Sequence, residues 1–363
     1  MKILLINTVP TDKNGITNVI FNFLRAIDRS EIQLDLVSIN HPDNFVLDEV
    51  IKLNINIHVL PRLSNILSYW VSLWKLIRQN KYDAVHIHGN SHTTVLELSA
   101  AKMAGCKTRI VHAHTTKCLN IYVHKLLTPS FNFLYTDGLA CGEAAGRFMF
   151  DQNKFSIINN GIDTEKFAFN QEVRKYIRIK NQWDGCKVIG HVGYFLEVKN
   201  HKWIIEVFRE LVNKDQSYRL VLIGDGKLRE LIVNKAKEYD LLKYITFTGS
   251  ISNVDEYLNA IDLIIMPSLF EGLPLSLIEQ QANGLRCVVS DTITKEVDKT
   301  NNLTFLSLSC SPKEWSDIIV NMKVLSDSDR KQKSDKAVKD IIKNGYSIKE
   351  EARKLKKLYM VEQ

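Results

Sequence analysis

The sequence predicts an α/β protein of two domains, each a doubly wound parallel sheet with helices on both faces. Short apolar runs rich in Val, Ile and Leu alternate with segments of helical periodicity over nearly the whole chain, which is typical of βαβ units. A turn-rich stretch at 159–163 interrupts this alternation. The length of 363 residues suits two domains that each bury a core of their own.

The first half is expected to contain a series of buried strands, because its apolar runs are short and rich in β-branched residues. These strands are expected at 3–7, 33–39, 57–60, 84–88, 108–112, 138–141 and 155–158. Helices are expected between them, most clearly at 17–27, 64–79 and 93–104, where apolar residues recur every three or four positions.

The second half restarts the alternation after a charged helix expected at 171–180. Its strands are expected at 188–192, 219–223, 245–248, 262–266 and 286–290, followed by a last helix at about 347–361. We therefore expect an N-terminal domain over 1–165 and a C-terminal domain over 166–345. The segment 346–363, which holds the last helix, is expected to cross back to the N-terminal domain.

Composition places the chain among globular proteins, with 45% apolar and 25% charged residues. The sequence contains no run of eighteen apolar residues, so no transmembrane helix is expected. The apolar start after Met1 is too short for the core of a signal peptide and is expected to be a first strand. The six cysteines are scattered without a C-x-x-C pair, so we expect reduced thiols and a cytoplasmic protein.

The net charge of +7 is partly concentrated in the C-terminal tail. Arg353, Lys354, Lys356 and Lys357 there outnumber the acidic residues beside them. Such a cluster is typical of a solvated helix face or of peripheral contact with anionic lipid, and both interpretations stay open. No nucleic-acid motif is present, so no nucleic-acid partner is expected.

The most informative stretch is Glu271-Gly-Leu-Pro-Leu-Ser-Leu-Ile-Glu279, which follows a predicted buried strand. A helix is expected to begin at or beside Pro274, because proline is tolerated in the first helical turn. The free N–H groups of that turn and the helix dipole form an anion site with one glutamate on each side. This pattern suits a nucleotide sugar, with phosphate in the middle and hydroxyls at both ends. The alternative is a pair of solvated surface glutamates.

Other candidate residues follow the predicted strands. Gly15 lies at the head of a helix after the first strand, where it is either a phosphate-binding glycine or an ordinary loop glycine. Gly193 ends another strand, and Lys199 stands six residues later at a helix start, which together suit a phosphate clamp. Gly224 and Gly226 suit either close approach of a ligand or a plain turn.

Four histidines end two neighbouring strands, His86 and His88 on one and His112 and His114 on the next. They raise the question of zinc, but no carboxylate or cysteine stands at a plausible spacing, and we expect no metal. Contact with phosphate and sugar hydroxyls explains His114 and the nearby Lys117 better. At least two of the four histidines are expected to be structural.

These motifs give the chain a resemblance to the family 4 retaining glycosyltransferases. The motifs that carry it, in order, are Asn160-Gly-Ile-Asp163, Gly193…Lys199, Gly224-Asp-Gly226, Phe247-Thr-Gly249 and the Glu271…Glu279 pair. The resemblance covers essentially the full length and implies the GT-B architecture, two Rossmann-like domains facing across a cleft. Within the family, the chain most resembles enzymes of bacterial capsule and exopolysaccharide assembly. This closer resemblance is carried by Val111-His-Ala-His114, Val198-Lys-Asn-His201 and Ser290-Asp-Thr-Ile-Thr-Lys-Glu296.

The resemblance implies a role for each matching residue. Glu279 would hold the ribose hydroxyls, and Glu271 would hold the hydroxyls of the transferred sugar. Lys199 and the amides around Gly15 would hold the diphosphate, with His114 near the sugar, although His112 competes for that role. The base would stack near Ser250 and Ile251. The remaining donor contacts would come from Gly193, Gly224, Gly272, Leu273, Leu275 and Ser276.

One position departs from the family pattern. The family usually has an arginine after the strand-end glycine, where this chain has Tyr194. Diphosphate binding would then depend more on Lys199 and helix N-termini, or on another base such as Lys117.

The function that the resemblance implies is a retaining transfer of a hexose from a nucleotide-diphosphate sugar, with a UDP-hexose as the expected donor. No metal or other cofactor is expected, and the acceptor is expected to be a lipid-linked saccharide. Trp70 and Trp74 either meet a bilayer or pack on their own sheet. Two other functions stay open: a GT-B-like nucleotide-sugar epimerase or phosphorylase, and a non-catalytic two-lobed sugar-binding protein.

Overall fold

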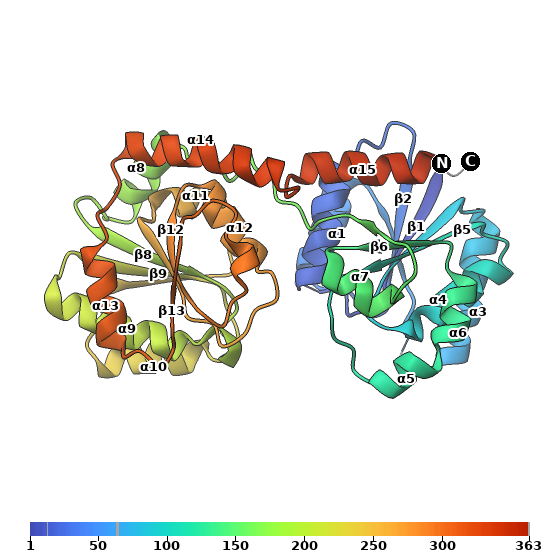
Figure 1. Ribbon diagram of the computed structural model, residues 1–363, viewed down its shortest axis with the longest axis horizontal. Coiled ribbons are helices and arrows are strands. Elements are labelled where there is room, and N and C mark those ends of the chain that lie inside the picture. The colour runs from blue at the N-terminus through green and yellow to red at the C-terminus, as the bar shows by residue number, and fades with distance from the viewer. Residues whose placement is uncertain (13, 63–64, 362–363) are drawn as a thin grey trace. The chain divides into compact units, whose positions relative to one another are not determined.

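The computed structural model describes residues 1–12, 14–62 and 65–361, with only the backbone of Val361. The chain forms two compact units (Figure 1). Unit 1 comprises Met1–Gly161 and Gly345–Gln363, and unit 2 comprises Ile162–Asn344. The first division falls inside the turn-rich stretch at 159–163, and the C-terminal segment belongs to unit 1.

Unit 1 contains a seven-stranded parallel sheet in the order β3-β2-β1-β4-β5-β6-β7. Its strands are β1 (Lys2–Asn7), β2 (Gln33–Ser38), β3 (Asn56–Val59), β4 (Ala84–His88), β5 (Thr108–Ala113), β6 (Asp137–Ala140) and β7 (Ser156–Ile157). The central strands β1, β4 and β5 are almost fully buried, as expected for a parallel sheet covered on both faces.

Helices lie on both sides of this sheet (Figure 1). They are α1 (Gly15–Ala26), α2 (Asn44–Leu53), α3 (Ile66–Asn80), α4 (Val95–Met103), α5 (Ile121–Leu126), α6 (Thr128–Leu134), α7 (Glu143–Phe150) and α15 (Ile348–Val361). The start predicted for the third helix, Ser64, lies outside the described residues. Trp70 and Trp74 on α3 pack against the core of unit 1, and the Trp70 indole N–H donates to Ser99 at 2.9 Å.

The C-terminal helix α15 lies against α1 within unit 1. Two long-range hydrogen bonds fix it. The Tyr359 hydroxyl lies 2.5 Å from Nδ1 of His86, and the Asn159 backbone N–H donates to the Glu351 carboxylate at 2.8 Å. The Glu351 side chain is fully buried, so α15 is an integral part of this unit rather than an appended tail.

Unit 2 repeats the architecture with six parallel strands in the order β10-β9-β8-β11-β12-β13. These are β8 (Lys187–Val192), β9 (Tyr218–Ile223), β10 (Ile245–Gly249), β11 (Leu263–Met266), β12 (Arg286–Ser290) and β13 (Leu303–Leu306). Its helices are α8 (Gln171–Lys180), α9 (His201–Lys214), α10 (Arg229–Glu238), α11 (Val254–Ala260), α12 (Leu275–Ala282), α13 (Pro312–Asn321) and α14 (Asp327–Lys343).

In both sheets the winding reverses beside the first strand of the unit, next to β1 in unit 1 and β8 in unit 2. Ligands of such sheets bind beyond the carboxyl ends of the strands at this reversal. The predicted class, two doubly wound parallel sheets, is confirmed. The edge strand β13 was not predicted, because its four residues are only half-buried and give a weak apolar pattern.

All six cysteines carry free thiols. Among the described residues, no helix combines the length and the apolar character needed to cross a membrane.

Candidate functional site

The glutamate motif of unit 2 joins β11 to α12, as predicted. Pro274 is the N-cap of α12, and no side chain caps the free amides of its first turn. Glu271 lies in the turn before the helix, whereas Glu279 lies inside it. The uncapped amides therefore offer hydrogen-bond donors to an anion between the two carboxyl groups.

Lys199 reaches this motif from another strand end. Its ammonium lies 2.6 Å from the Glu271 carboxylate, and the two side chains are only 17% and 14% exposed. Gly193 lies directly beside Lys199, because a Cβ at Gly193 would lie 3.1 Å from His191 Nε2 and 3.4 Å from the lysine Cδ and Cε atoms. The structure thus joins the two residues predicted to hold the diphosphate and the transferred sugar.

Glu279 has a different environment. Burial raises the pKa of its carboxyl to about 8; Lys166 opposes this shift and Asp255 adds to it. Lys166 and Asp255 are themselves paired at 3.3 Å. The Glu279 carboxyl therefore holds its proton to a higher pH than an ordinary glutamate does, although the residue is partly exposed. The sequence analysis missed Lys166 and Asp255, because neither belongs to a motif and only the tertiary fold brings them near Glu279.

The glycines at the end of β9 are explained by backbone packing. Gly224 and Gly226 have φ values of +140° and +153°, and a Cβ at Gly224 would lie 2.1 Å from the Gly193 carbonyl oxygen. The Gly224 N–H also donates to the carbonyl of Gly249, the residue before Ser250 and Ile251. The three predicted loops that begin at Gly193, Gly224 and Gly249 therefore lie together at one edge of the sheet.

The other donor candidates of unit 2 surround the start of α12. Gly272 is exposed, whereas Leu273, Leu275 and Ser276 are partly exposed. Tyr194, which replaces the usual arginine, directly follows Gly193 and is partly exposed. Charged groups at this edge include the Lys199–Glu271 pair, and the Lys166–Asp255 pair acts on Glu279.

Gly15 is the first residue of α1 in unit 1. Asn14 caps this helix by accepting a hydrogen bond from the Thr17 N–H at 3.0 Å. A Cβ at Gly15 would meet no atom within 4 Å, so the space beside it is open. One amide of the turn, that of Thr17, is therefore already satisfied, just as the Leu277 amide in the first turn of α12 bonds to the Pro274 carbonyl.

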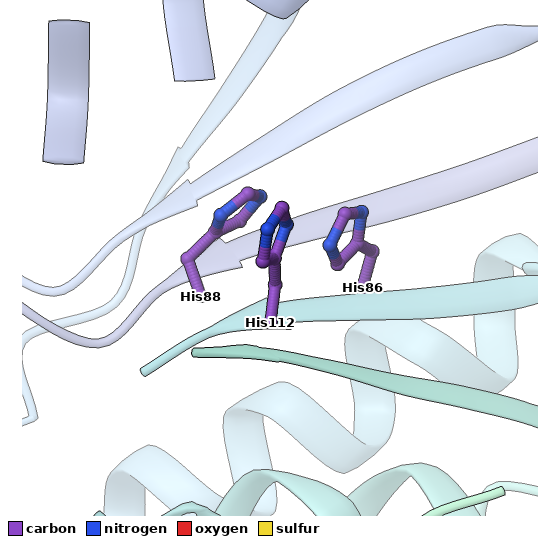
Figure 2. A group of neighbouring side chains, drawn as sticks. All are labelled: His86, His88 and His112. Carbon is purple, nitrogen blue, oxygen red and sulfur yellow. The ribbon is translucent and has the colours of Figure 1, made fainter. Parts of the chain in front are cut away.

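The four histidines at the ends of β4 and β5 form one cluster in unit 1. His88 Nδ1 lies 2.8 Å from His114 Nε2, and the rings of His86 and His112 stack with an interplanar angle of 10°. Figure 2 shows the neighbouring rings of His86, His88 and His112. Burial lowers the pKa of these three imidazoles well below the usual range, so all three are neutral.

The cluster distinguishes His114 from His112. His112 is fully buried and neither of its ring nitrogens has a hydrogen-bond partner. His114 is partly exposed, and burial lowers its pKa to about 4, while the nearby Asn160 side chain opposes this shift. Of the two competing residues, His114 is therefore the more exposed, although its Nδ1 atom is buried and has no hydrogen-bond partner.

A metal ion is one conceivable occupant of this cluster, because His86, His88 and His112 offer ring nitrogens within 4.8 Å of one another. One nitrogen of His86 bonds to Tyr359 and one of His88 to His114, and the rings stack on one another. Nε2 of His86 and both ring nitrogens of His112 are buried without a hydrogen-bond partner.

Comparison with known proteins matches both units. The model of "Glycosyl transferases group 1" matches residues 173–354, and that of "Glycosyltransferase Family 4" matches residues 13–166. The putative glycosyltransferase EpsF of Bacillus subtilis is 33% identical over 324 residues, which cover 85% of this chain and 84% of that protein.

Two further proteins are similar over most of their length. The UDP-Gal:alpha-D-GlcNAc-diphosphoundecaprenol alpha-1,3-galactosyltransferase of Escherichia coli is 29% identical over 314 residues, 80% of this chain and 78% of that protein. Among solved structures, HepE of Anabaena in complex with UDP has a TM-score of 0.77 at 15% identity, and covers 99% of this chain and 100% of its own. At that identity the likeness shows the fold alone.

Proposed function

The chain belongs to the group 1 and family 4 glycosyltransferases, and from this premise we propose that it is a retaining, metal-independent hexosyltransferase. Its donor is a UDP-hexose, and its acceptor is a lipid-linked saccharide precursor of capsule or exopolysaccharide. The family and the fold predicted from the sequence are thereby confirmed. We propose the donor, the acceptor, the retaining course and the metal independence in addition to this family membership.

One observation supports the donor most directly, namely the Lys199–Glu271 ion pair beside the uncapped start of α12. A nucleotide-diphosphate sugar offers a partner to each member, because its diphosphate binds Lys199 and its sugar hydroxyls bind Glu271. The α12 amides then complete the diphosphate site. Glu279 lies about one and a half turns inside α12 and would bind the ribose hydroxyls. These hydroxyls can donate hydrogen bonds to its carboxyl group and accept one from it when it is protonated.

Transfer by this site requires stabilisation of the leaving diphosphate. Lys199 and the helix dipole of α12 supply positive charge where negative charge develops, and they are already oriented in the folded chain. Glu271 would orient the reacting ring, on which positive charge develops. The predicted place of His114 near the sugar stays a prediction, supported by its partial exposure.

A lipid-linked acceptor is proposed because the similar E. coli enzyme is named for a diphosphoundecaprenol acceptor and EpsF is named as a glycosyltransferase. Such an acceptor would bring the protein to a membrane surface from the cytoplasm, as a peripheral protein.

The test begins with a thermal-shift panel of nucleotide sugars, since a ligand at about 100 times its Kd raises stability by roughly 2.7 kcal/mol. The donor found is then incubated with and without a lipid-linked saccharide. Transfer that depends on the acceptor, with the anomeric configuration retained, is the expected result. Interconversion of the donor without acceptor would instead indicate an epimerase, phosphate-dependent cleavage a phosphorylase, and binding without turnover a sugar-binding protein.

A further inference from the structure

Among the described residues of unit 1, the three most exposed apolar side chains lie on and just before α5. We name the exposed apolar side chains of this segment the α5 surface; it consists of Leu119, Ile121, Tyr122, Val123 and Leu126. Leu119 is fully exposed, and Tyr122 and Leu126 are 83% and 78% exposed. Tyr122 and Leu126 lie four residues apart in α5 and so share one side of the helix, and Leu119 immediately precedes the helix cap Asn120. Contiguous exposed apolar side chains mark interaction sites, whereas single ones are ordinary.

This exposure is built into the fold, because α5 is anchored from its other side. His124 is the buried residue of α5, and its ring stacks on His92 with a centroid distance of 3.7 Å. His92 Nδ1 also lies 2.8 Å from the His124 carbonyl oxygen. Asn120 caps the helix by accepting from the N–H groups of Tyr122 and Val123. The helix is therefore held in place with its apolar side chains outward.

The chain segment that carries the α5 surface has charges of a single sign. The sequence contains no acidic residue between Glu97 and Asp137, but it contains Lys102, Lys107, Arg109, Lys117 and Lys125. Lys117 and Lys125 flank the apolar residues directly, and both are exposed. A surface that combines exposed apolar side chains with lysines is complementary to an anionic bilayer, whose headgroups are negative and whose interior is apolar.

The basic tail, by contrast, is largely neutralised by acidic neighbours. Arg353 pairs with Glu350 and Lys354 with Glu351, both at 2.5 Å, and Lys356 pairs with Asp28 at 2.7 Å. Trp70 and Trp74 are also unsuited to lipid contact, because they pack on the core. The two features that the sequence suggested for membrane contact, the basic tail and the Trp70–Trp74 pair, thus mainly make contacts within unit 1.

We propose that the α5 surface docks on the anionic face of a lipid bilayer. Leu119, Tyr122 and Leu126 enter the headgroup boundary, and Lys117 and Lys125 lie against lipid phosphates. This inference rests on the proposed function in one respect, namely that a lipid-linked acceptor gives the protein a reason to be at a membrane. The docking itself is measured without acceptor or donor.

The test is co-sedimentation of the full chain with vesicles of phosphatidylglycerol and phosphatidylcholine. The double variant Leu119→Ser/Leu126→Ser should weaken binding at least about tenfold, from lost apolar burial. Lys125→Gln should weaken it about fivefold, as expected for one lost cation near an anionic surface. Ile51→Ser is the matched control, because Ile51 on α2 is 77% exposed in the same unit. Lys357→Gln is the control for the tail.

The proposal is overturned if the wild-type chain does not bind these vesicles, or if the α5 variants bind as well as the wild type. It is also overturned if Lys357→Gln weakens binding as much as Lys125→Gln does. Light scattering provides a further check: a wild-type dimer that the double variant converts to a monomer would assign the surface to self-association.

Failure of the docking is separable from failure of the proposed function. Transfer to a short-chain acceptor in detergent needs no bilayer, so the double variant should retain it while it loses vesicle binding. Vesicle binding with no transfer to any acceptor would refute the proposed function and leave the docking surface intact. Unchanged melting temperatures and UDP affinities verify that the variants are folded.

Discussion

Replacing Glu271 with glutamine is expected to tighten the binding of UDP while it slows sugar transfer. In the unliganded site the Glu271 carboxylate holds the Lys199 ammonium at 2.6 Å. The diphosphate of UDP competes with Glu271 for this cation. Because UDP carries no sugar that could engage Glu271 in return, the ion pair opposes UDP binding. Glu271→Gln removes the competitor and leaves Lys199 available.

The magnitude follows from how far the pair is withdrawn from water. Exposed ion pairs contribute about 0.2–1 kcal/mol, whereas breaking a buried pair costs about 3–5 kcal/mol. With side chains 17% and 14% exposed, this pair lies between the two cases. If the ion pair opposes UDP binding by about 1–2 kcal/mol, Glu271→Gln should bind UDP roughly five- to thirtyfold more tightly than the wild type does. Loss of the bond to the sugar, about 1.5–3 kcal/mol, should lower kcat about ten- to a hundredfold.

The assay is calorimetric titration of UDP into the wild type, Glu271→Gln and Lys199→Ala, alongside kcat with the full donor. Lys199→Ala should weaken UDP binding, since it removes the cation itself. Glu197→Gln is the matched control, because Glu197 is an exposed acid in the same loop, 3.8 Å from Lys202. If Glu271→Gln weakens UDP binding, or if neither site variant changes it, the ion pair does not lie at the diphosphate site and the reasoning fails.

Further predictions concern the buried titratable groups and the metal. The pKa of Glu279 is raised to about 8 by burial, so the folded chain holds this proton more tightly than the unfolded chain, and stability should fall as pH rises from about 4.5 to about 8. Glu279→Gln should remove that slope in urea unfolding and weaken UDP binding; an unchanged slope would contradict the assignment. The pKa of His112 is lowered, so its neutral form favours folding above pH 6.5 and stability is lost as pH falls below that value. His112→Leu should therefore lessen acid destabilisation between pH 7.5 and 5, measured by the same unfolding, and an equal or greater loss than in the wild type would count against this. Tyr359→Phe should lower the free energy of unfolding by about 1 kcal/mol through loss of its bond to His86, with no change in UDP affinity. EDTA should leave the transfer rate nearly unchanged, and a large loss that manganese restores would refute metal independence.

The local sequence determined the elements and the start of α12 after the glutamate turn. Apolar runs separated by helical periodicity are sufficient to predict parallel strands and their crossover helices, because burial on both faces forces that pattern. Pro274 marks the start of α12, since proline is compatible with a first turn and little else in a helix. The edge strand β13 and the short helix α5 escaped prediction, because half-exposed segments give weak patterns.

Only the tertiary structure decided how the side chains combine. Lys199 and Glu271 are 72 residues apart, and nothing in their local spacing predicts that one neutralises the other. The burial that raises the Glu279 pKa and the exposure that separates His114 from His112 depend on how whole elements pack. Likewise, the charge of Lys356 is balanced by Asp28, and the sequence cannot show this because the two residues are 328 positions apart. Sequence patterns encode which face of an element is buried, whereas ion pairs and pKa values depend on contacts made only after the chain has folded.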